Sequence, residues 1–206
     1  MSARVYECLK HIGEKIIENR DFLTDLDREI GDADHGTNMA RGFSAVIDKV
    51  PQDNPDIGVA LKKTGMALLS TVGGASGPLY GTAYMEAAKV LAGKETLSKE
   101  DFKAAFDAAV AGIQKRGKSV RGEKTMLDAL IPALEAYSLR LAEGGSLSDG
   151  LDCACAAAAE GVAFTKTIAA TKGRASYLGA RSIGHQDPGA TSATMTLEAI
   201  RDFIKG

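Results

Sequence analysis

The chain has 206 residues, and its 25 basic and 27 acidic side chains leave a net charge of −2. This length suits one domain with a substantial core, and the lack of a basic excess argues against a nucleic-acid-binding protein. The sequence has no apolar signal-peptide core and no apolar run of about 18 residues, so we expect a cytoplasmic protein that binds no membrane. Its three cysteines suit a reducing compartment better than a disulfide framework.

Apolar residues recur at helical spacing almost throughout the chain, and no convincing alternating strand interrupts them. In chain order, the apolar stripes fall at residues 5–16, 39–50, 61–69, 80–91, 102–113, 127–141, 147–171 and 195–204. Ser98 and Ser146 each precede a stripe and are followed three residues later by aspartate, which is typical of a helix-capping box. The sequence therefore predicts an all-α protein of about eight helices, with a single domain over residues 1–206.

Four segments rich in glycine and polar residues break the helical pattern, at residues 26–38, 72–78, 116–126 and 172–191. In an all-helical domain, such segments connect the ends of helices. Segments that alternate along the chain can lie at the same end of the domain and converge on one site. These four segments are therefore the expected place for a binding site.

The first segment contains three carboxylates, Asp27, Asp32 and Asp34, within eight residues. Two carboxylates about 5 Å apart repel each other by roughly 3 kcal/mol, so such a cluster is either fully solvated or binds a cation. Oxygen ligands alone suit Mg²⁺ or Ca²⁺ rather than zinc. An EF-hand loop is excluded. If Asp32 were position 1 of such a loop, position 6 would be Thr37 instead of glycine, and position 12 would be Phe43 instead of glutamate. The segment favours Mg²⁺ with water and phosphate as further ligands, and a solvated acidic turn is the alternative.

Two further segments have features of anion-binding sites. Residues 72–78 place small residues and the Ser76 hydroxyl before a predicted helix, where backbone N–H groups can bind an anion. Residues 172–191 contain several cations and glycines, and Arg174 among them can donate two parallel hydrogen bonds to phosphate. The alternatives are a tight turn between helices for the first segment and a long surface loop for the second.

Residues 112–119 match the phosphate-loop pattern G-x-x-x-x-G-K-[ST], but their surroundings exclude that motif. The motif requires a strand before the loop and a helix that begins at the lysine. Here a helical stripe precedes the segment, and Val120, Arg121 and Gly122 follow it instead of a helix. A P-loop fold is therefore rejected, although these basic residues can still contact phosphate.

Together, the clustered carboxylates, the small-residue loop and the cationic loop predict a Mg²⁺–nucleotide site on a helical domain. At these same segments the chain resembles the family of nucleotide-binding L subunits of dihydroxyacetone kinases. The resemblance covers essentially the whole chain in order. The matching runs are residues 26–36, 72–81, 116–118, 124–126, 172–179 and 182–189.

The resemblance implies an eight-helix antiparallel barrel with the nucleotide at one mouth. In that family, the aspartates that match Asp27, Asp32 and Asp34 bind two Mg²⁺ ions, which bridge the phosphates of ADP or ATP. The other matches to nucleotide-binding positions are His35, Gly36, Thr37, Asn38, Ala75, Ser76, Gly117, Thr125, Met126, Arg174, Asp187, Pro188 and Gly189. Arg174 and His35 are expected to act in the reaction itself. Arg174 would neutralise phosphate charge, and His35 would donate a hydrogen bond to phosphate instead of acting as a general base.

The resemblance also implies a phosphotransferase of the glycerone kinase type that is active only with a partner. In the family, a separate K subunit holds the acceptor, dihydroxyacetone, and 206 residues cannot contain both parts. A free-standing L chain resembles the phosphotransferase-system type, in which a phosphohistidine protein of the M type rephosphorylates the bound ADP in place. We expect no direct contact with nucleic acid, and a homodimer is compatible with the sequence.

Two alternative functions stay open at this level. The chain can be an ATP-dependent L subunit for dihydroxyacetone or another short ketose, or a nucleotide-bound regulator of a transcription factor. Three aspartates together with Arg174 are what a phosphoryl carrier needs, and they do not exclude a regulatory role. The acceptor is set by the partner subunit, and the sequence identifies neither the phosphoryl donor nor the docking surface.

Overall fold

The computed structural model describes residues 3–53 and 55–206, and all regular elements within them are helices. They are α1 (Ala3–Glu18), α2 (Arg20–Ile30), α3 (His35–Lys49), α4 (Ile57–Thr71), α5 (Ser76–Val90), α6 (Lys99–Gly117), α7 (Leu127–Ala142), α8 (Leu147–Thr165), the 3₁₀-helix η1 (Arg174–Ser182) and α9 (Pro188–Lys205). The predicted all-α fold is confirmed. No helix in the described part of the chain is long and apolar enough to cross a membrane.

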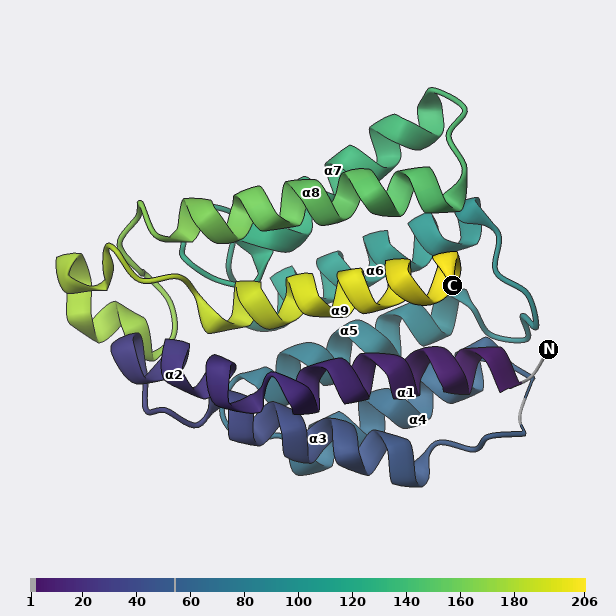
Figure 1. The fold of residues 1–206 in the computed structure, drawn as a ribbon, viewed down its shortest axis with the longest axis horizontal. Helices are drawn as coiled ribbons and strands as arrows, with labels where there is room; N and C mark the ends of the chain where they lie inside the picture. The colour runs from purple at the N-terminus through teal and green to yellow at the C-terminus, as the bar shows by residue number, and fades with distance from the viewer. Residues whose placement is uncertain (1–2, 54) are drawn as a thin grey trace.

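The long helices form a closed ring (Figure 1). α1 packs against α3, and the series continues through α4, α5, α6, α7, α8 and α9, which packs back against α1. Only Asn19 separates α1 from α2, and α2 continues the direction of α1 towards one end of the molecule. The pair therefore acts as one kinked member, and the ring is the eight-helix barrel that the family resemblance implies.

Both predicted capping boxes are present at helix N-termini. In α6, the Ser98 hydroxyl accepts a hydrogen bond from the Asp101 N–H, and the Asp101 carboxylate accepts one from the Ser98 N–H. Ser146 and Asp149 make the same exchange at the start of α8. Each box pairs N–H groups that the helix itself leaves without partners, and so fixes where the helix begins.

The core lies inside the ring and is contributed by helices from all around it. The fully buried side chains Ile16, Phe43, Leu68, Leu127 and Tyr137 come from α1, α3, α4 and α7. Burial of a large apolar side chain of this kind stabilises the fold by about 1.5–3 kcal/mol. The apolar stripes predicted from the sequence therefore point into a shared interior.

Glycine allows two pairs of neighbouring helices to approach closely. A Cβ on Gly65 of α4 would lie 2.6 Å from Cγ of Met85 and 2.8 Å from the carbonyl oxygen of Gly81, both on α5. A Cβ on Gly161 of α8 would collide with the carbonyl oxygen of Asp128 on α7. Glycines that interrupt predicted helical stripes thus serve helix packing.

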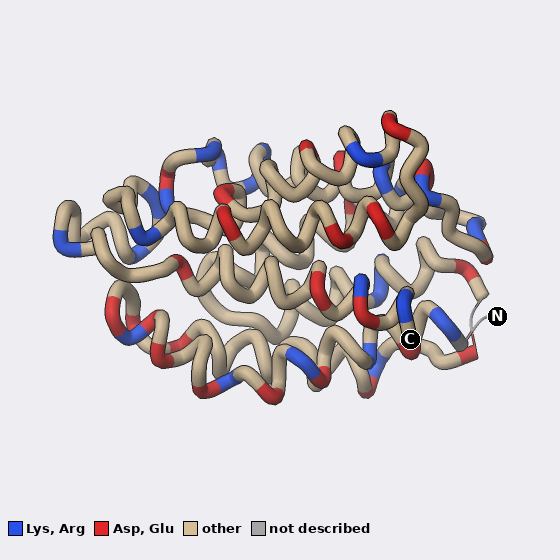
Figure 2. The backbone as a smooth tube through the Cα atoms, turned by 45° about the horizontal axis from the view of Figure 1, so that its top comes forward, with Lys and Arg blue, Asp and Glu red and all other residues tan. Residues whose placement is uncertain are grey.

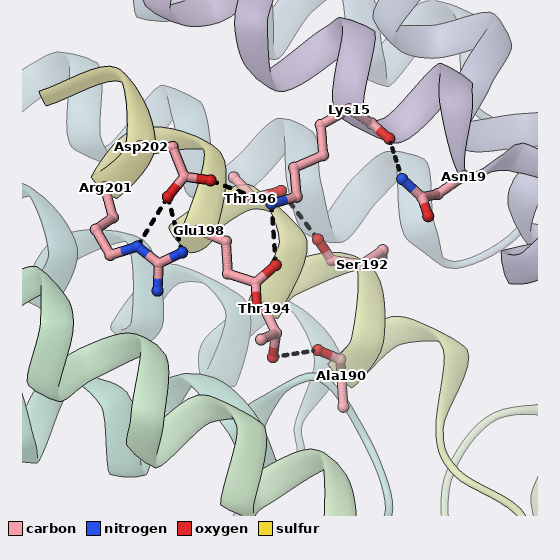
Figure 3. Close-up of polar contacts among 9 residues, drawn as sticks. All are labelled: Lys15, Asn19, Ala190, Ser192, Thr194, Thr196, Glu198, Arg201 and Asp202. Atoms are coloured by element: carbon pink, nitrogen blue, oxygen red, sulfur yellow. Dashed lines mark hydrogen bonds and ion pairs between the residues drawn. The ribbon is translucent and has the colours of Figure 1, made fainter. Parts of the chain in front are cut away.

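Lys15 on α1 forms ion pairs with α9, where the first and last helices of the chain pack together. Its Nζ lies 3.1 Å from the Glu198 carboxylate and 3.5 Å from the Asp202 carboxylate (Figure 3). Asp202 also accepts hydrogen bonds from Arg201 on the same helix. These side chains are partly exposed, so the pairs contribute little free energy and mainly favour one alignment of the two helices.

The interior of the ring contains a cavity of about 420 Å³, lined mainly by apolar side chains. Tyr80, Ile113 and Met126 line this cavity and also a second one at the end of the barrel. These three side chains therefore form the wall between the two spaces.

With α1 and α2 taken as one member, successive members of the ring run in opposite directions, so the connections alternate between the two ends of the barrel (Figure 1). The connections at residues 31–34, 72–75, 118–126 and 166–187 lie at the end opposite to the two chain termini. Figure 2 shows acidic and basic positions together at this end. The four segments singled out in the sequence therefore converge, as predicted.

Two boundaries differ from the predictions. α2 extends to Ile30, so Asp27 lies in the last turn of a helix and not in a loop. α8 ends at Thr165 and does not continue towards residue 171. The residues after Thr165 instead form a long connection that contains η1.

Candidate functional site

The four converging connections enclose a cleft of about 460 Å³ at one end of the barrel. α3, α5, α7 and α9 all begin beside it, so N–H groups of helix N-termini are available there. The predicted site residues that line the cleft are Asp27, Asp32, Asp34, His35, Ala75, Ser76, Gly117, Thr125, Met126, Arg174, Asp187, Pro188 and Gly189.

The three predicted metal ligands converge at one side of this cleft. One carboxylate oxygen from each of Asp27, Asp32 and Asp34 lies within 4.8 Å of the others. Carboxylates this close repel one another unless a cation lies among them, and hard divalent ions prefer oxygen ligands. The donor set therefore fits Mg²⁺.

The turn between α2 and α3 fixes the position of Asp27, which is buried. Its Oδ2 accepts hydrogen bonds from the backbone N–H groups of Asp34 (2.8 Å) and His35 (3.1 Å). At Gly31, just after α2, a Cβ would collide with the Asp27 carboxylate. Ala33 has a φ of +59°, a conformation that is costly for a residue with a side chain and is found at functional sites. The turn is thus built around the carboxylate of Asp27.

Arg174 faces the carboxylates from the 166–187 connection. Its Nε lies 2.8 Å from Oδ2 of Asp32, and these side chains are 67% and 35% exposed. A solvent-exposed ion pair of this kind is weak and can exchange partners. The guanidinium is therefore within reach of an anion held beside the three carboxylates.

His35 is buried at the start of α3, and both of its ring nitrogens have hydroxyl partners. Nδ1 lies 3.1 Å from Oγ of Ser76, and Nε2 lies 2.9 Å from Oγ of Ser192. Burial lowers the pKa of His35 to about 4, although the nearby Asp27 carboxylate favours the charged form. A neutral imidazole with so low a pKa is a weak base, which agrees with the expectation that His35 is not a general base. Its two ring nitrogens contact serine hydroxyls, so the predicted direct hydrogen bond to phosphate stays a prediction.

The connection before α5 supplies small residues to the cleft wall. Gly73, Gly74 and Ala75 line the cleft next to Ser76, the first residue of α5. Gly74 has a φ of +63°, which residues with a side chain rarely adopt. Since Gly74 and Ala75 are exposed and face the cleft, the N–H groups at this helix N-terminus are accessible to an anion.

Three predicted nucleotide-binding residues, Gly36, Thr37 and Asn38, lie in the first turn of α3 and are not among the lining residues. Gly36 is buried where a Cβ would collide with the carbonyl oxygen of Arg20. Thr37 is exposed, and Asn38 is buried. The Asn38 amide lies beside the backbone of Gly73, where an added Cβ would be 3.1 Å from it, so Asn38 supports the cleft wall from behind.

Lys124, which the sequence analysis did not single out, fastens two connections together. It is 1% exposed, and its Nζ donates to the carbonyl oxygens of Thr165 (2.5 Å), His185 and Ile168 (3.4 Å). The carbonyl of Thr165, the last residue of α8, is directed to this ammonium instead of to a further turn of the helix. Lys124 therefore ends α8 and ties the 166–187 connection to the cleft.

Two buried carboxylates order the backbone around Lys124. Oδ2 of Asp187 accepts a hydrogen bond of 2.6 Å from the Ala190 N–H and so caps α9. Burial raises the pKa of Asp187 to about 7. Asp128 accepts hydrogen bonds from the N–H groups of Gly122 (2.5 Å) and Thr125 (2.8 Å). These carboxylates fix the backbone that carries the predicted nucleotide contacts.

Sequence reasoning missed Lys124, Asp128, Tyr80 and Ser192. Tyr80 and Lys124 line the cleft, and the other two support its backbone and side chains. The signal available for Tyr80 and Lys124 was their place inside runs that match the family. A single buried charged or hydroxyl side chain produces no repeating pattern in the sequence. Its role can therefore be recognised only from the fold.

An all-helical barrel whose cleft combines clustered carboxylates, an open helix N-terminus and an arginine has the characteristics of a metal-dependent phosphate-binding protein. The sequence profile of the DAK2 domain matches residues 29–202. The chain belongs to the DAK2 domain family.

The relatives include subunits of about the same length as this chain and several much longer proteins. The chain is 44% identical over 198 residues to "PEP-dependent dihydroxyacetone kinase, ADP-binding subunit DhaL" of Escherichia coli, covering 96% of this chain and 94% of that one. It is 42% identical over 199 residues to "PTS-dependent dihydroxyacetone kinase, ADP-binding subunit DhaL" of Lactococcus lactis, covering 96% and 95%. It is 33% identical over 206 residues to the human "Triokinase/FMN cyclase", covering 99% of this chain and 36% of that protein.

Solved structures of the dihydroxyacetone kinase of C. freundii have the same fold. The native form aligns with a TM-score of 0.73 at 24% identity, covering 96% of this chain and 34% of that one. The complex with AMP-PNP and Mg²⁺ aligns with a TM-score of 0.72 at 23% identity, covering 96% and 33%. The chain thus spans about a third of that kinase, and the likeness establishes the barrel architecture.

Proposed function

We propose that this chain is the ADP-binding subunit of a dihydroxyacetone kinase. It would transfer a phosphoryl group from Mg²⁺-bound nucleotide to dihydroxyacetone held on a separate subunit. The observation that carries the proposal is the convergence of Asp27, Asp32 and Asp34 within 4.8 Å, at a cleft that also contains Arg174. The 44% identity to the E. coli ADP-binding subunit, over nearly the full length of both chains, supports it.

Asp27, Asp32 and Asp34 would hold two Mg²⁺ ions, since three carboxylates offer enough oxygen atoms to share between them. When bound, the ions would supply positive charge that offsets the negative charge of the phosphates. Asp27 already accepts two backbone hydrogen bonds at Oδ2. We therefore assign it the most rigid ligand position and assign the two less buried aspartates the positions that adjust to the nucleotide.

The phosphates would lie between the carboxylates and the start of α5. Ser76 can donate its hydroxyl proton, and the open N-terminus of α5 can donate N–H groups. Arg174 would leave Asp32 to neutralise charge as the phosphoryl group transfers. His35 would act through its hydrogen bond to Ser76, and Asn38 would hold the wall at Gly73.

The nucleoside would occupy the part of the cleft lined by Gly117, Thr125 and Met126. Gly189 packs against Met126 there, so Gly189 and the neighbouring Pro188 would extend the same wall. Gly36, Thr37 and Asp187 would shape the backbone of the site. No general base is assigned to this chain, because catalysis here is positioning and charge neutralisation.

The acceptor would come from a partner that docks at the mouth of the cleft. We infer a K-type subunit carrying dihydroxyacetone, and a phosphohistidine protein that rephosphorylates bound ADP, since the E. coli and L. lactis relatives are named as PEP- and PTS-dependent. We propose that residues 1–206 act as one domain, because a single ring includes helices from both ends of the chain.

Calorimetry of Mg·ADP binding tests the metal assignment. Asp32→Asn should weaken binding at least tenfold, because one charged ligand becomes a neutral amide while the fold is kept. Asp25→Asn is the matched control, since Asp25 pairs with Arg28 on the surface of α2 and does not line the cleft. Undiminished affinity in Asp32→Asn, or equal losses in both variants, would overturn the assignment.

The phosphoryl donor is tested by denaturing the purified chain and analysing the nucleotide that it releases. Stoichiometric ADP, with turnover only when a phosphohistidine donor and a K-type subunit are added, is the expected result. A nucleotide-free chain that turns over with free ATP and the K-type subunit would instead identify an ATP-dependent kinase subunit.

A further inference from the structure

A row of four hydrogen-bonded side chains connects the barrel interior with the cleft. Tyr80 Oη lies 2.7 Å from Oγ of Ser192, and that oxygen lies 2.9 Å from Nε2 of His35. Nδ1 of His35 lies 3.1 Å from Oγ of Ser76. The four residues come from α5, α9 and α3, and Ser192 can be located on α9 in Figure 3. We term these four side chains the hydroxyl relay.

We propose that Tyr80 and Ser192 are positioning residues that direct the hydroxyl proton of Ser76 into the cleft, towards a bound phosphate. The phosphate is part of the proposed function, on which this inference rests. The direction of the relay is a property of the ligand-free chain and can be measured independently.

The direction of the relay begins at Tyr80. Burial raises the pKa of Tyr80, so its hydroxyl keeps its proton. Ser192 Oγ is the hydrogen-bond partner of Tyr80 Oη within the described residues, so if Ser192 donated to Tyr80, the phenol proton would be left without an acceptor. An unpaired buried donor is disfavoured, because it gives up its hydrogen bond to water without a replacement. Tyr80 therefore donates, and Ser192 accepts.

Ser192 then has one proton and two acceptors within reach. Nε2 of His35 lies at 2.9 Å, and the carbonyl oxygen of Gly189 lies at 3.2 Å. If Ser192 donates to His35, the imidazole carries its proton on Nδ1, donates to Ser76 and leaves the Ser76 proton free for a ligand. If Ser192 donates to Gly189, the imidazole proton lies on Nε2 and the Ser76 proton is used on Nδ1.

The first arrangement suits a phosphate ligand. Phosphate oxygens are acceptors, so they need the Ser76 proton and are repelled by a Ser76 oxygen that presents only lone pairs. Donation from Tyr80 polarises the Ser192 hydroxyl and makes it a stronger donor to His35. Tyr80 and Ser192 thus select the imidazole tautomer that prepares Ser76 for the nucleotide.

Nitrogen NMR of His35 in the ligand-free chain tests the direction. The wild type should carry the imidazole proton on Nδ1, and Tyr80→Phe should shift the population towards Nε2. Tyr84→Phe is a matched control, because the Tyr84 hydroxyl lies one turn further along α5 and is buried without a hydrogen-bond partner in the described structure. A wild-type proton on Nε2, or a tautomer unchanged by Tyr80→Phe, would overturn the proposal.

Calorimetry then measures the consequence for the ligand. Tyr80→Phe and Ser192→Ala should each weaken Mg·ADP binding about three- to tenfold, the range expected when one hydrogen bond to an anion is weakened. Tyr84→Phe should bind as the wild type does. Equal affinities in all four proteins would contradict the relay. A wild type that binds no Mg·ADP would instead contradict the proposed function, and the tautomer measurement would still decide the direction of the relay.

Discussion

The Asp27 carboxylate has a structural role in the turn before α3 and is also a proposed metal ligand, and substitution can separate the two roles. Asp27→Asn keeps an oxygen that can accept from the N–H groups of Asp34 and His35, whereas Asp27→Ala removes it. We expect both variants to lose Mg·ADP affinity. Only Asp27→Ala should also lower the free energy of unfolding, by about 1–2 kcal/mol, because the start of α3 loses its acceptor. Urea unfolding alongside calorimetry checks both effects.

Asp32 provides the contrast for that experiment. It pairs with Arg174 at an exposed position, so Asp32→Ala should change the free energy of unfolding by less than about 0.5 kcal/mol while affecting ligand affinity. If Asp27→Ala and Asp32→Ala were equally stable, the capping role assigned to Asp27 would be wrong.

Asp187 gives the fold a pH dependence in a specific window. Its pKa is 3.8 in the reference state and about 7 in the folded chain, because burial disfavours the carboxylate. Between these values the folded chain binds a proton that the unfolded chain has lost, so stability falls as the pH rises. Relative to Asp187→Asn, the free energy of unfolding of the wild type should fall by at most about 1.4 kcal/mol per pH unit from about pH 5 to pH 7. Above about pH 7, the difference between the two proteins should stay constant.

Unfolding free energies measured from pH 5 to pH 8 check this prediction. Asp149→Asn is the control, because hydrogen bonds from Ser146 lower the pKa of Asp149, and its titration therefore lies below the tested range. A wild type whose stability changes with pH in parallel with Asp187→Asn would show that burial does not hold a proton on Asp187.

At the scale of residues, the sequence predicts side chains whose chemistry is written into a local pattern. Three aspartates close to glycine suggest a cation site before any fold is known, and the structure brings them together. Lys124 has no such pattern, because a lysine between Glu123 and Thr125 looks like any surface residue. Its role comes from carbonyl oxygens about 40 to 60 positions away in the sequence.

At the scale of elements, Lys124 determines how the 166–187 connection is held. Lys124→Met should destabilise the chain by about 2–3 kcal/mol, because carbonyl oxygens that accept from the ammonium lose their donor in a buried place. In Lys124→Met, the backbone amides of residues 166–187 should exchange with solvent faster than in the wild type, and the amides of the distant helices should change less. Hydrogen exchange and urea unfolding together measure the two effects.

Lys118→Met is the matched control for that experiment. Lys118 and Lys124 both lie in the 118–126 connection and both have a positive φ, 48° and 60°, but the Lys118 side chain is exposed. It should leave both stability and exchange close to the wild type. If both variants lost a similar amount of unfolding free energy, the Lys124 ammonium would not be what holds the 166–187 connection.

Helix ends illustrate what the sequence can and cannot predict about elements. The starts of α6 and α8 follow from Ser98 and Ser146, whose capping partners lie three residues away. The end of α8 depends on an ammonium from another segment, so no local pattern marks Thr165 as the last helical residue. Local hydrogen bonding is predictable from local sequence, and termination by a distant side chain is not.

For the whole molecule, the ring explains why four separate segments form one site. Eight members that alternate in direction place every second connection at the same end, so residues 31–34 and 166–187 become neighbours. Apolar periodicity predicts the helices and their inward faces. It does not predict that α9 packs back on α1, and the expectation of a closed barrel came from the family resemblance.

Closure of the ring leads to a prediction about circular permutation. α1 and α9 are antiparallel neighbours, and Figure 1 shows the chain termini at the end of the barrel opposite the connections at residues 72–75 and 166–187, which line the cleft. A short flexible linker between the termini should therefore complete one more hairpin. A permutant opened between Gly144 and Gly145, in the α7–α8 turn away from the cleft, should fold and bind Mg·ADP within about threefold of the wild type.

A second permutant with the same linker, opened between Val120 and Arg121, cuts a connection of the cleft. It should keep its helical circular dichroism, because every helix and every helix pair is preserved, but it should bind Mg·ADP at least tenfold more weakly. The free ends would no longer hold Gly122 and Thr125 against Asp128. Equal binding by both permutants would show that the site does not depend on this connection. Loss of helical structure in both would show that the ring does not close through α1 and α9.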